Sequence, residues 1–291
     1  MLSVVIPALN EGVHLRSTVE SLRATVPDDT EIIVVDDDSN DGCADFLRSA
    51  NPTATLLEPE EPPVRLGAPQ ARNKGARTAR GELIIFTDAH MQFPTGWAEP
   101  LAQVLDNPSV GAAAPAISVL GSPENKGFGL RWRDRQLGVE WLPSRASEPY
   151  DVPLLPGACF ALRRDLFVEC GGFDVGLSRW GLEDSELSLR LWTRGYDLCM
   201  VPEVDVAHLF RERHPYAVDW DDLLFNTLRV AWMHFSDRRL TIVIDALKPY
   251  SGFTNALSRL ADSDAGERRT ELRTNRARDD DAYFRRFGDI L

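Results

Sequence analysis

The sequence predicts an α/β fold in which helices flank one mostly parallel sheet and a helical appendage follows at the C-terminus. Through the first half of the 291 residues, short apolar runs alternate with amphipathic helical patterns. That alternation favours parallel strands joined by right-handed helical crossovers. Acidic residues follow two of the apolar runs, and parallel sheets bind their ligands where strands end. We therefore expect the site at the edge formed by these strand ends.

The first half supplies four expected strands and four expected helices. The strands are apolar runs bounded by turn-forming residues, at 2–6, 32–35, 53–57 and 82–86. The helices are expected over residues 15–22, 41–50, 71–79 and 97–105. Between them, the Pro-rich and acidic segment EPEEPPVRLGAP is expected to form a loop.

The second half is less regular. Residues 121–150 are rich in Gly, Pro, Arg and Trp with little period, which is typical of a long functional or disordered loop. A helix is expected to open near Glu183, a strand to end near His208, and a helix to begin at Asp221 and Asp222. The charged tail after residue 250 is expected to be helical or partly disordered. We divide the chain into a catalytic domain, residues 1–240, and a helical, charged extension, residues 241–291.

Composition and charge narrow the partners. The formal net charge is −13, from 32 Lys and Arg against 45 Asp and Glu, which disfavours nucleic acid as a partner. The four cysteines form no CxxC pair and are interpreted as reduced core thiols. The sequence opens directly on a strand pattern and has no run of 18 apolar residues. We expect a cytoplasmic protein without a transmembrane segment, for which association with a membrane surface stays open.

The stretch FTDAHM places Asp88 and His90 two residues apart at the end of an expected strand. One interpretation is an ordinary turn, because Asp favours turns. The other is a metal site, because two ligand-type side chains at a strand end can converge on one ion. The pair alone leaves both interpretations open.

Four segments in order resemble the family-2 nucleotide-sugar glycosyltransferases, which share the glycosyltransferase A (GT-A) fold. They are SVVIPALNEG, IIVVDDDSNDG, ARNKGARTARGELIIFTDAH and WGLEDSELSLR, and the resemblance runs from residue 2 to about residue 235. It implies a single Rossmann-like sheet. A second set is similar to the catalytic domain of the polypeptide N-acetylgalactosaminyltransferases: TDAHMQFPTGWAEPL, PGACFALRRDLF, WGLEDSELSLRLW and VAHLFRERHPY.

The resemblance favours the metal interpretation. The N-acetylgalactosaminyltransferases have Asp-x-His at this point and a later His in a segment similar to VAHLFR. Asp88, His90 and His208 would then hold one divalent ion on the donor diphosphate, neutralising charge on the departing nucleotide. Imidazole ligands favour Mn²⁺ over Mg²⁺.

The same resemblance suggests how the nucleotide is bound. Asp37 matches the acid that reads the base in family-2 enzymes, and Pro7 and Leu9 fall where that family lays backbone along the nucleoside. Glu11 lies in the same segment and is either a donor contact or a solvated acid. Arg72 matches a position that commonly faces the nucleotide. For three further residues contact and a purely local role stay open: Asp36, Asp38 and Lys74.

Glu183 and Asp184 carry the catalytic assignment. Inverting glycosyltransferases of this fold have a Glu-Asp pair here, and the Asp takes the acceptor proton. The retaining N-acetylgalactosaminyltransferases have Asn at the position of Asp184. We favour inversion because a carboxylate can accept a proton and an amide cannot. A helix N-terminus at Asp184 would favour the charged carboxylate and lower its basicity.

Other candidate site residues have two interpretations each. Trp180 is either a wall for the donor sugar or acceptor, or a core residue. Gly157 and Ala158 suggest that the backbone approaches a ligand closely. The residues after the third ligand could form a loop over the donor: Arg211, Arg213 and His214. The middle segment is the candidate acceptor surface, or its tryptophans anchor it to the core: Arg131, Trp132, Arg133 and Trp141.

Together these observations predict a metal-dependent glycosyltransferase with a nucleotide-sugar donor, UDP-linked in preference to other nucleotides, and an inverting outcome. The alternatives are a retaining enzyme like the N-acetylgalactosaminyltransferases, a nucleotidyltransferase and a non-catalytic nucleotide-sugar binder. The acceptor is open between a peptide, a natural product, a lipid-linked sugar and a glycan. The oligomeric state, including a homo-oligomer, is open as well.

Overall fold

The computed structural model describes residues 1–48, 54–59, 64–212 and 215–291. Ten strands of these residues form one sheet. Its main path runs β10-β12-β6-β11-β4-β1-β2-β3, with β5 on β12 and β7 on β6. The strands are β1 (Leu2–Ala8), β2 (Glu31–Asp36), β3 (Thr55–Leu57), β4 (Leu83–Thr87), β5 (Met91–Gln92), β6 (Val110–Val119), β7 (Ser122–Gly127), β10 (Tyr150–Asp151), β11 (Cys159–Arg163) and β12 (Asp197–His208). The predicted α/β fold class is confirmed.

The N-terminal strands pair in parallel, as their alternation with helices predicts. β1 lies between β2 and β4, and β3 extends the parallel set beside β2. Beyond β4 the sheet is mixed, because β11 runs antiparallel between β4 and β6. This pairing sets Cys159 opposite Thr87, so the segment that leads into β11 arrives where β4 ends. The predicted site edge therefore gains residues from the second half of the chain.

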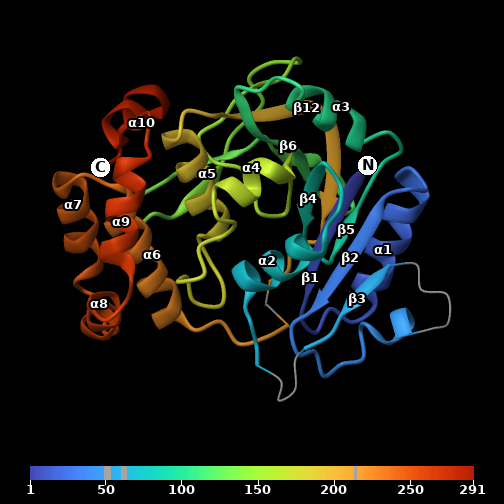
Figure 1. Ribbon diagram of the computed structural model, residues 1–291, viewed down its shortest axis with the longest axis horizontal. Coiled ribbons are helices and arrows are strands. Elements are labelled where there is room, and N and C mark those ends of the chain that lie inside the picture. The colour runs from blue at the N-terminus through green and yellow to red at the C-terminus, as the bar shows by residue number, and fades with distance from the viewer. Residues whose placement is uncertain (49–53, 60–63, 213–214) are drawn as a thin grey trace.

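Helices cover both faces of the sheet (Figure 1). Alternate side chains of β1 enter two different hydrophobic clusters, as the two-residue period of a strand requires. Val4 and Ile6 pack with α1 (Val13–Thr25) and α3 (Ala98–Leu105), whereas Val5 packs with α2 (Ala68–Thr78). Gly75 lets α2 approach closely, since a Cβ there would lie 2.3 Å from a methyl of Val5.

Two expectations from the sequence were wrong. The helix expected at 41–50 is only the 3₁₀ turn Asp45–Arg48 within the described residues, because the Asp41 carboxylate accepts the Cys43 N–H and Gly42 adopts a left-handed φ of 75°. Residues 49–50 lie outside the described residues. The irregular segment 121–150 instead contains β7, the hairpin of β8 (Leu130–Trp132) and β9 (Val139–Trp141), and the start of β10.

The C-terminal helices share one hydrophobic cluster with the β8–β9 hairpin and α5 (Glu183–Thr193). They gather at one end of the molecule, away from α1 (Figure 1). Tyr283 and Phe284 are fully packed there, so the described tail is ordered. The predicted boundary at residue 240 falls inside α7, and the two-part division stays a prediction. These helices are α6 (Trp220–His234), α7 (Asp237–Leu247), α8 (Phe253–Ala261), α9 (Ala265–Thr274) and α10 (Asp280–Phe287).

Two predictions from composition were tested by the structure. All four cysteines are buried and free. Among the described residues, none of the helices combines the length and apolarity that a membrane span requires.

A buried polar network fixes α5, the helix that carries the predicted catalytic acids, beside α4 (Arg164–Glu169) and the loop after it. Glu186 accepts hydrogen bonds from Arg190 at 2.9 and 2.7 Å and lies 3.0 Å from the His234 ring. Arg190 also donates to the carbonyl oxygens of Cys170 and Gly172. Burial would raise the pKa of Glu186, but the charge of Arg190 and the contact with His234 outweigh it and hold that pKa well below its ordinary value.

We expect Glu186→Gln to lower the free energy of unfolding by about 3–5 kcal/mol, because it leaves Arg190 buried without its counter-charge. Urea unfolding followed by circular dichroism measures the change. Since the folded pKa of Glu186 is depressed, the difference should be full at neutral pH and shrink as the pH falls below the ordinary carboxylate range. Asp245→Asn, in an exposed pair with Lys248, should cost below about 1 kcal/mol. Equal losses in the two variants would contradict the role of the network.

Candidate active site

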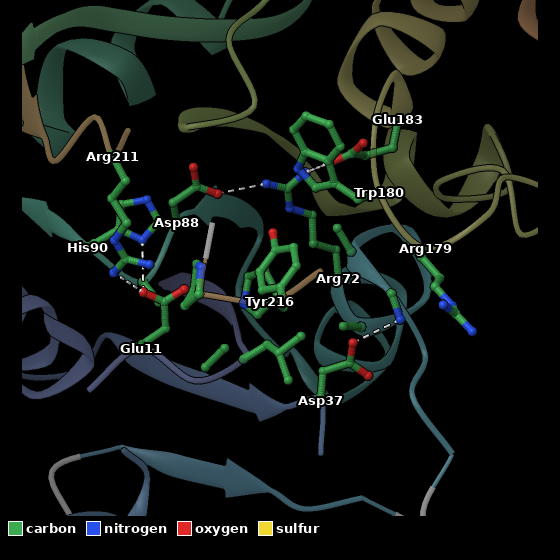
Figure 2. Close-up of a pocket in the computed structure, with 18 of the residues that line it drawn as sticks. Glu11, Asp37, Arg72, Asp88, His90, Arg179, Trp180, Glu183, Arg211 and Tyr216 are labelled. Atoms are coloured by element: carbon green, nitrogen blue, oxygen red, sulfur yellow. Dashed lines mark hydrogen bonds and ion pairs between the residues drawn. The ribbon is translucent and has the colours of Figure 1, made fainter. Parts of the chain in front are cut away.

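Two adjoining cavities open at the carboxyl ends of β1, β2 and β4, where the strand pattern predicts a site. The first has a volume of about 280 Å³ and the second about 380 Å³. Five residues line both cavities: Arg72, Asp88, Trp180, Glu183 and His208. Figure 2 shows the first cavity, with Asp88, Arg72 and Glu183 joined by hydrogen bonds across it.

The structure brings the predicted nucleotide-binding residues together. Pro7 and Leu9 lie at and just after the end of β1, and Glu11 follows them in the same turn. Asp37 comes directly after β2, where its N–H donates to the carbonyl oxygen of Ala8 at 2.9 Å. All four line the first cavity. Their proximity follows from the parallel pairing of β1 with β2, which places Ala8 opposite Asp36.

Asp37 and its neighbours have different local roles. One carboxylate oxygen of Asp37 accepts the N–H of Leu66 at 2.5 Å and the other accepts the N–H of Gly67 at 2.9 Å. The carboxylate thereby anchors the segment that opens α2, and burial raises its pKa. Asp36 accepts the Ser39 N–H at 3.0 Å, which favours the local turn role that the sequence left open.

Asp88, His90 and His208 form the predicted metal-ligating group. One ligand atom from each residue lies within 4.8 Å of the others. Nε2 of His208 is 3.4 Å from an Asp88 oxygen, and the two imidazole rings lie 4.8 Å apart between centroids. Nδ1 of His208 is buried and has no hydrogen-bond partner among the described residues. One carboxylate and two imidazoles suit Mn²⁺ better than Mg²⁺, so the residues fit the expected ion.

Glu11 orients one of these candidate ligands. Its carboxylate lies 3.1 Å from Nδ1 of His90 and accepts a hydrogen bond from Arg211 at 2.6 Å. Glu11 is only 6% exposed, so the alternative of a solvated acid was wrong. A carboxylate on the far nitrogen of an imidazole fixes the ring's orientation and tautomer at metal sites. Glu11 therefore supports the ligand role of His90.

Arg72 lies at the centre of the acidic residues. Arg72 is 2% exposed, and its guanidinium donates to Glu183 at 2.8 Å, to Asp88 at 3.0 Å and to the Gly157 carbonyl oxygen at 2.9 Å. Burial would raise the pKa of Asp88, but contact with His208 and the charge of Arg72 hold that pKa well below its ordinary value. Arg72 lines the cavity as predicted, with the terminal nitrogens already engaged by protein groups.

Asp184 lines only the second cavity. Its Oδ2 accepts the Gly157 N–H at 2.9 Å and its Oδ1 accepts the Ser185 N–H at 2.7 Å. A Cβ at Gly157 would lie 2.9 Å from Oδ2, so this glycine permits the approach of Asp184, and it also lines the second cavity. Burial raises the pKa of Asp184 despite the nearby Arg72. The lowered basicity expected from the helix N-terminus was therefore wrong, because desolvation is the larger effect.

The loop before α5 is held from the C-terminal helices. The Asn226 side chain accepts the Ser178 N–H and donates to three carbonyl oxygens of the loop, including that of Trp180 at 3.1 Å. Arg259 of α8 donates to Ser178 at 2.6 Å, and Arg229 of α6 bridges Asp174 and Asp264. Trp180 is half-buried and lines both cavities, so its predicted contact with the donor sugar or the acceptor stays a proposal.

Several residues of the first cavity escaped the sequence reasoning. Arg65 is 3.8 Å from Asp37 and stacks its guanidinium over the Tyr216 ring at 4.8 Å. Burial raises the pKa of Tyr216 to about 12. A basic residue in an otherwise acidic Pro-rich segment was the only available signal for Arg65. Other such residues are Arg179, Leu209 and Phe210. Arg213 and His214 lie outside the described residues.

The remaining candidate site residues differ in whether they line one of the two cavities. Trp141 lines the second cavity and is 38% exposed, whereas Trp132 is buried in the C-terminal hydrophobic cluster. Arg131 pairs with Glu140 and Arg133 pairs with Asp134, and neither arginine lines the first or the second cavity. Lys74 donates to the Glu58 carbonyl oxygen at 2.7 Å and lines neither cavity.

Comparison with known proteins yields two family matches. Residues 3–171, more than half of the chain, match the model described as glycosyl transferase family 2. Residues 131–215 match the N-terminal domain of galactosyltransferase. Over 79% of this chain, the sequence is 34% identical to the mouse polypeptide N-acetylgalactosaminyltransferase 12. Over 80% of this chain, it is 30% identical to the Xenopus tropicalis polypeptide N-acetylgalactosaminyltransferase 11. It spans 43% of each of these relatives, less than half their length.

Solved structures give the same fold. A crystal structure of GalNAc-T7 with UDP, GalNAc and Mn²⁺ has a TM-score of 0.79 and 25% identity, covering 98% of this chain and 56% of that one. A mannosyltransferase from Pyrobaculum calidifontis in complex with GDP-Man and Mn²⁺ has a TM-score of 0.58 at 21% identity, over 94% and 78%. The predicted GT-A fold is confirmed by these similarities.

The candidate metal group makes a direct prediction. We expect His208→Ala to weaken Mn²⁺ binding by more than about 10-fold, and Glu11→Gln to weaken it by about 10–100-fold through the loss of His90 orientation. Electron paramagnetic resonance of free Mn²⁺ measures both without any turnover. His14→Ala is the matched control, since His14 lies outside the group that could hold an ion. Unchanged affinity in His208→Ala would remove that residue from the site.

Proposed function

Because the chain belongs to glycosyl transferase family 2, we propose that it transfers a sugar from a UDP-linked donor to an acceptor hydroxyl with inversion. The observation that carries the proposal is the pair of cavities. The group that could hold a metal ion and the Asp37 carboxylate line the first cavity, and another carboxylate, that of Asp184, lines only the second. We assign the nucleotide of the donor to the first cavity, the transferred sugar to the boundary between the two cavities, and the acceptor to the second cavity.

The first cavity would hold the nucleotide. Asp37 would accept the ring N–H of uracil, beside the backbone of Pro7 and Leu9. Asp88, His90 and His208 would lie at the diphosphate, where a bound divalent ion supplies charge neutralisation to the leaving group. The family relationship supports the nucleotide-sugar donor, and the GalNAc-T7 structure with UDP supports uridine as the base.

Asp184 would act as the general base. As the acceptor oxygen forms its bond to the anomeric carbon, the bond from that carbon to the diphosphate breaks and the nucleotide leaves with the electron pair. The acceptor proton passes to the Asp184 carboxylate. The burial that raises its pKa makes this carboxylate a stronger base at neutral pH than an exposed aspartate. Glu183 would remain paired with Arg72 and hold the shape of the shared wall.

A donor screen tests the proposed function. Purified protein is incubated with UDP-, GDP- and dTDP-sugars, with Mn²⁺ or with EDTA, and the released nucleoside diphosphate is measured. We expect slow hydrolysis of a UDP-sugar that requires Mn²⁺. Release from none of the donors, together with no thermal stabilisation by UDP and Mn²⁺, would contradict the proposal. The anomer of the eventual product, read by NMR, separates inversion from retention.

We expect Asp184→Asn to lower kcat for transfer by about 10²–10⁴-fold, because an amide cannot accept the acceptor proton. The donor KM should change little, since Asp184 does not line the first cavity. Steady-state kinetics at saturating acceptor measure both constants. Glu20→Gln, an exposed acid on α1, is the control. Full activity in Asp184→Asn would refute the base assignment, and so would a retained anomeric configuration in the wild-type product.

The pH dependence of kcat supplies a separate prediction. A base whose pKa is raised is protonated, and therefore inactive, up to a higher pH than an ordinary aspartate. We expect kcat to fall on the acid side with an apparent pKa above the usual aspartate value of 3.8. A profile at constant ionic strength and saturating Mn²⁺ measures it. An acid limb at or below the ordinary value would show that another group receives the proton.

A further inference from the structure

The second cavity has apolar walls. Besides the shared Trp180, six large apolar side chains from three separate parts of the chain line it, while Asp88 and Glu183 lie at the boundary with the first cavity and Asp184 lines the second alone. The six are Leu130, Leu137, Val139, Trp141, Leu182 and Leu223. They come from the β8–β9 hairpin, the start of α5 and the first turns of α6. Apart from the residues at the shared boundary and Asp184, the polar side chains that line the cavity are few: Gln136, Ser185 and Thr227.

Two of these leucines have left-handed backbones. Leu137 has a φ of 59° and Leu182 a φ of 69°, a region that few residues except Gly, Asn and Asp adopt readily. The turn at Leu137 is held by Asp134, whose carboxylate accepts the N–H groups of Gln136 and Gly138, both at 3.0 Å. Strained residues held so firmly cluster at ligand sites. Both leucines line the same cavity.

An aromatic pair joins the two cavities. Trp141 lines the second cavity and Phe210 the first, and their rings meet edge to face at 6.1 Å. They are 38% and 44% exposed, so solvent reaches both. Exposed aromatic side chains beside an apolar cavity are typical of binding sites for apolar or aromatic ligands.

We infer that the second cavity takes an acceptor whose hydroxyl is carried on an uncharged, apolar body, such as a small phenol or aliphatic alcohol. The inference rests on the proposed function, since it assigns the hydroxyl to Asp184. A glycan acceptor would leave most of its hydroxyls against leucine and valine without hydrogen-bond partners. An anionic acceptor would meet Asp184 and Glu183, and the Arg72 guanidinium that also lines the cavity already donates to Glu183 and Asp88.

The first arm of the test compares acceptors with the full chain, its active donor and Mn²⁺. The panel pairs p-cresol with 4-hydroxybenzoate, which differ in charge at nearly equal size, and adds 2-naphthol, methyl glucoside and a Ser/Thr peptide. We expect kcat/KM to be at least 10-fold higher for p-cresol and 2-naphthol than for the other three. Preferred transfer to the glycoside or the peptide would overturn the inference while leaving the proposed function intact.

The second arm changes the cavity wall. Leu137→Asn removes an apolar side chain from the wall at a position whose left-handed backbone suits Asn. Because Leu137 is 2% exposed and belongs to the C-terminal hydrophobic cluster, the change costs core packing, and a melting curve first shows that the variant is folded. Leu223→Asn, at a half-buried position of the same wall, replaces it if it is not. We expect the KM for 2-naphthol to rise by about 10-fold, because the ligand loses contact with one leucine-sized apolar surface. Leu257→Asn, an exposed leucine on α8, is the matched control. An unchanged KM in Leu137→Asn would overturn the inference.

Calorimetric binding separates the two failures if transfer is not seen. 2-Naphthol is titrated into the protein with UDP and Mn²⁺ present. Binding that weakens about 10-fold in Leu137→Asn supports the apolar site independently of turnover. Absence of binding, or equal affinity in the wild type and the variant, overturns it. Failure of the donor screen with intact 2-naphthol binding would instead count against the proposed transfer reaction.

Discussion

Arg72 is the charge around which the site is built. Its guanidinium lies on α2, almost without solvent, and reaches the end of β4 through Asp88 and the start of α5 through Glu183. Removing carboxylates from water is costly unless a positive charge and hydrogen bonds replace the water. Because one guanidinium serves two acids and a carbonyl oxygen, the three segments that carry them are held in one arrangement. Both cavities share this wall.

The antiparallel insertion of β11 explains why that arrangement is reachable. The parallel strand β12 brings only its own end, with His208, from the second half of the chain to Asp88. β11 instead brings the turn before it to the end of β4, where the Ala158 carbonyl oxygen accepts the Asp88 N–H at 3.0 Å. Gly157 then contacts both Arg72 and Asp184. One strand of opposite direction thus links the two halves of the site.

The sequence predicted what depends on local pattern and on motif order. The parallel strands, α5 beginning at Glu183 and the convergence of Asp88, His90 and His208 all follow from those features. It failed where distant segments decide. Strands of three residues are too short to show a period, so the β8–β9 hairpin was not recognised. Arg65 and Tyr216 gain their meaning only from the first cavity. The direction in which the pKa of Asp184 shifts depends on burial by groups that are remote in sequence.

The ties between the C-terminal helices and the loop before α5 have a consequence for the architecture of the molecule. Arg259 and the Arg229–Asp264 pair connect helices α6, α8 and α9 to the loop that carries Trp180. These helices therefore act as a brace, meaning that they hold the loop before α5 in place and are not a separable module. Exchanging residues 241–291 for another C-terminal unit would remove Arg259 and Asp264 together and leave Arg229 with only Asp174. In a chain rearranged by recombination, this brace and its loop would have to be inherited as one piece.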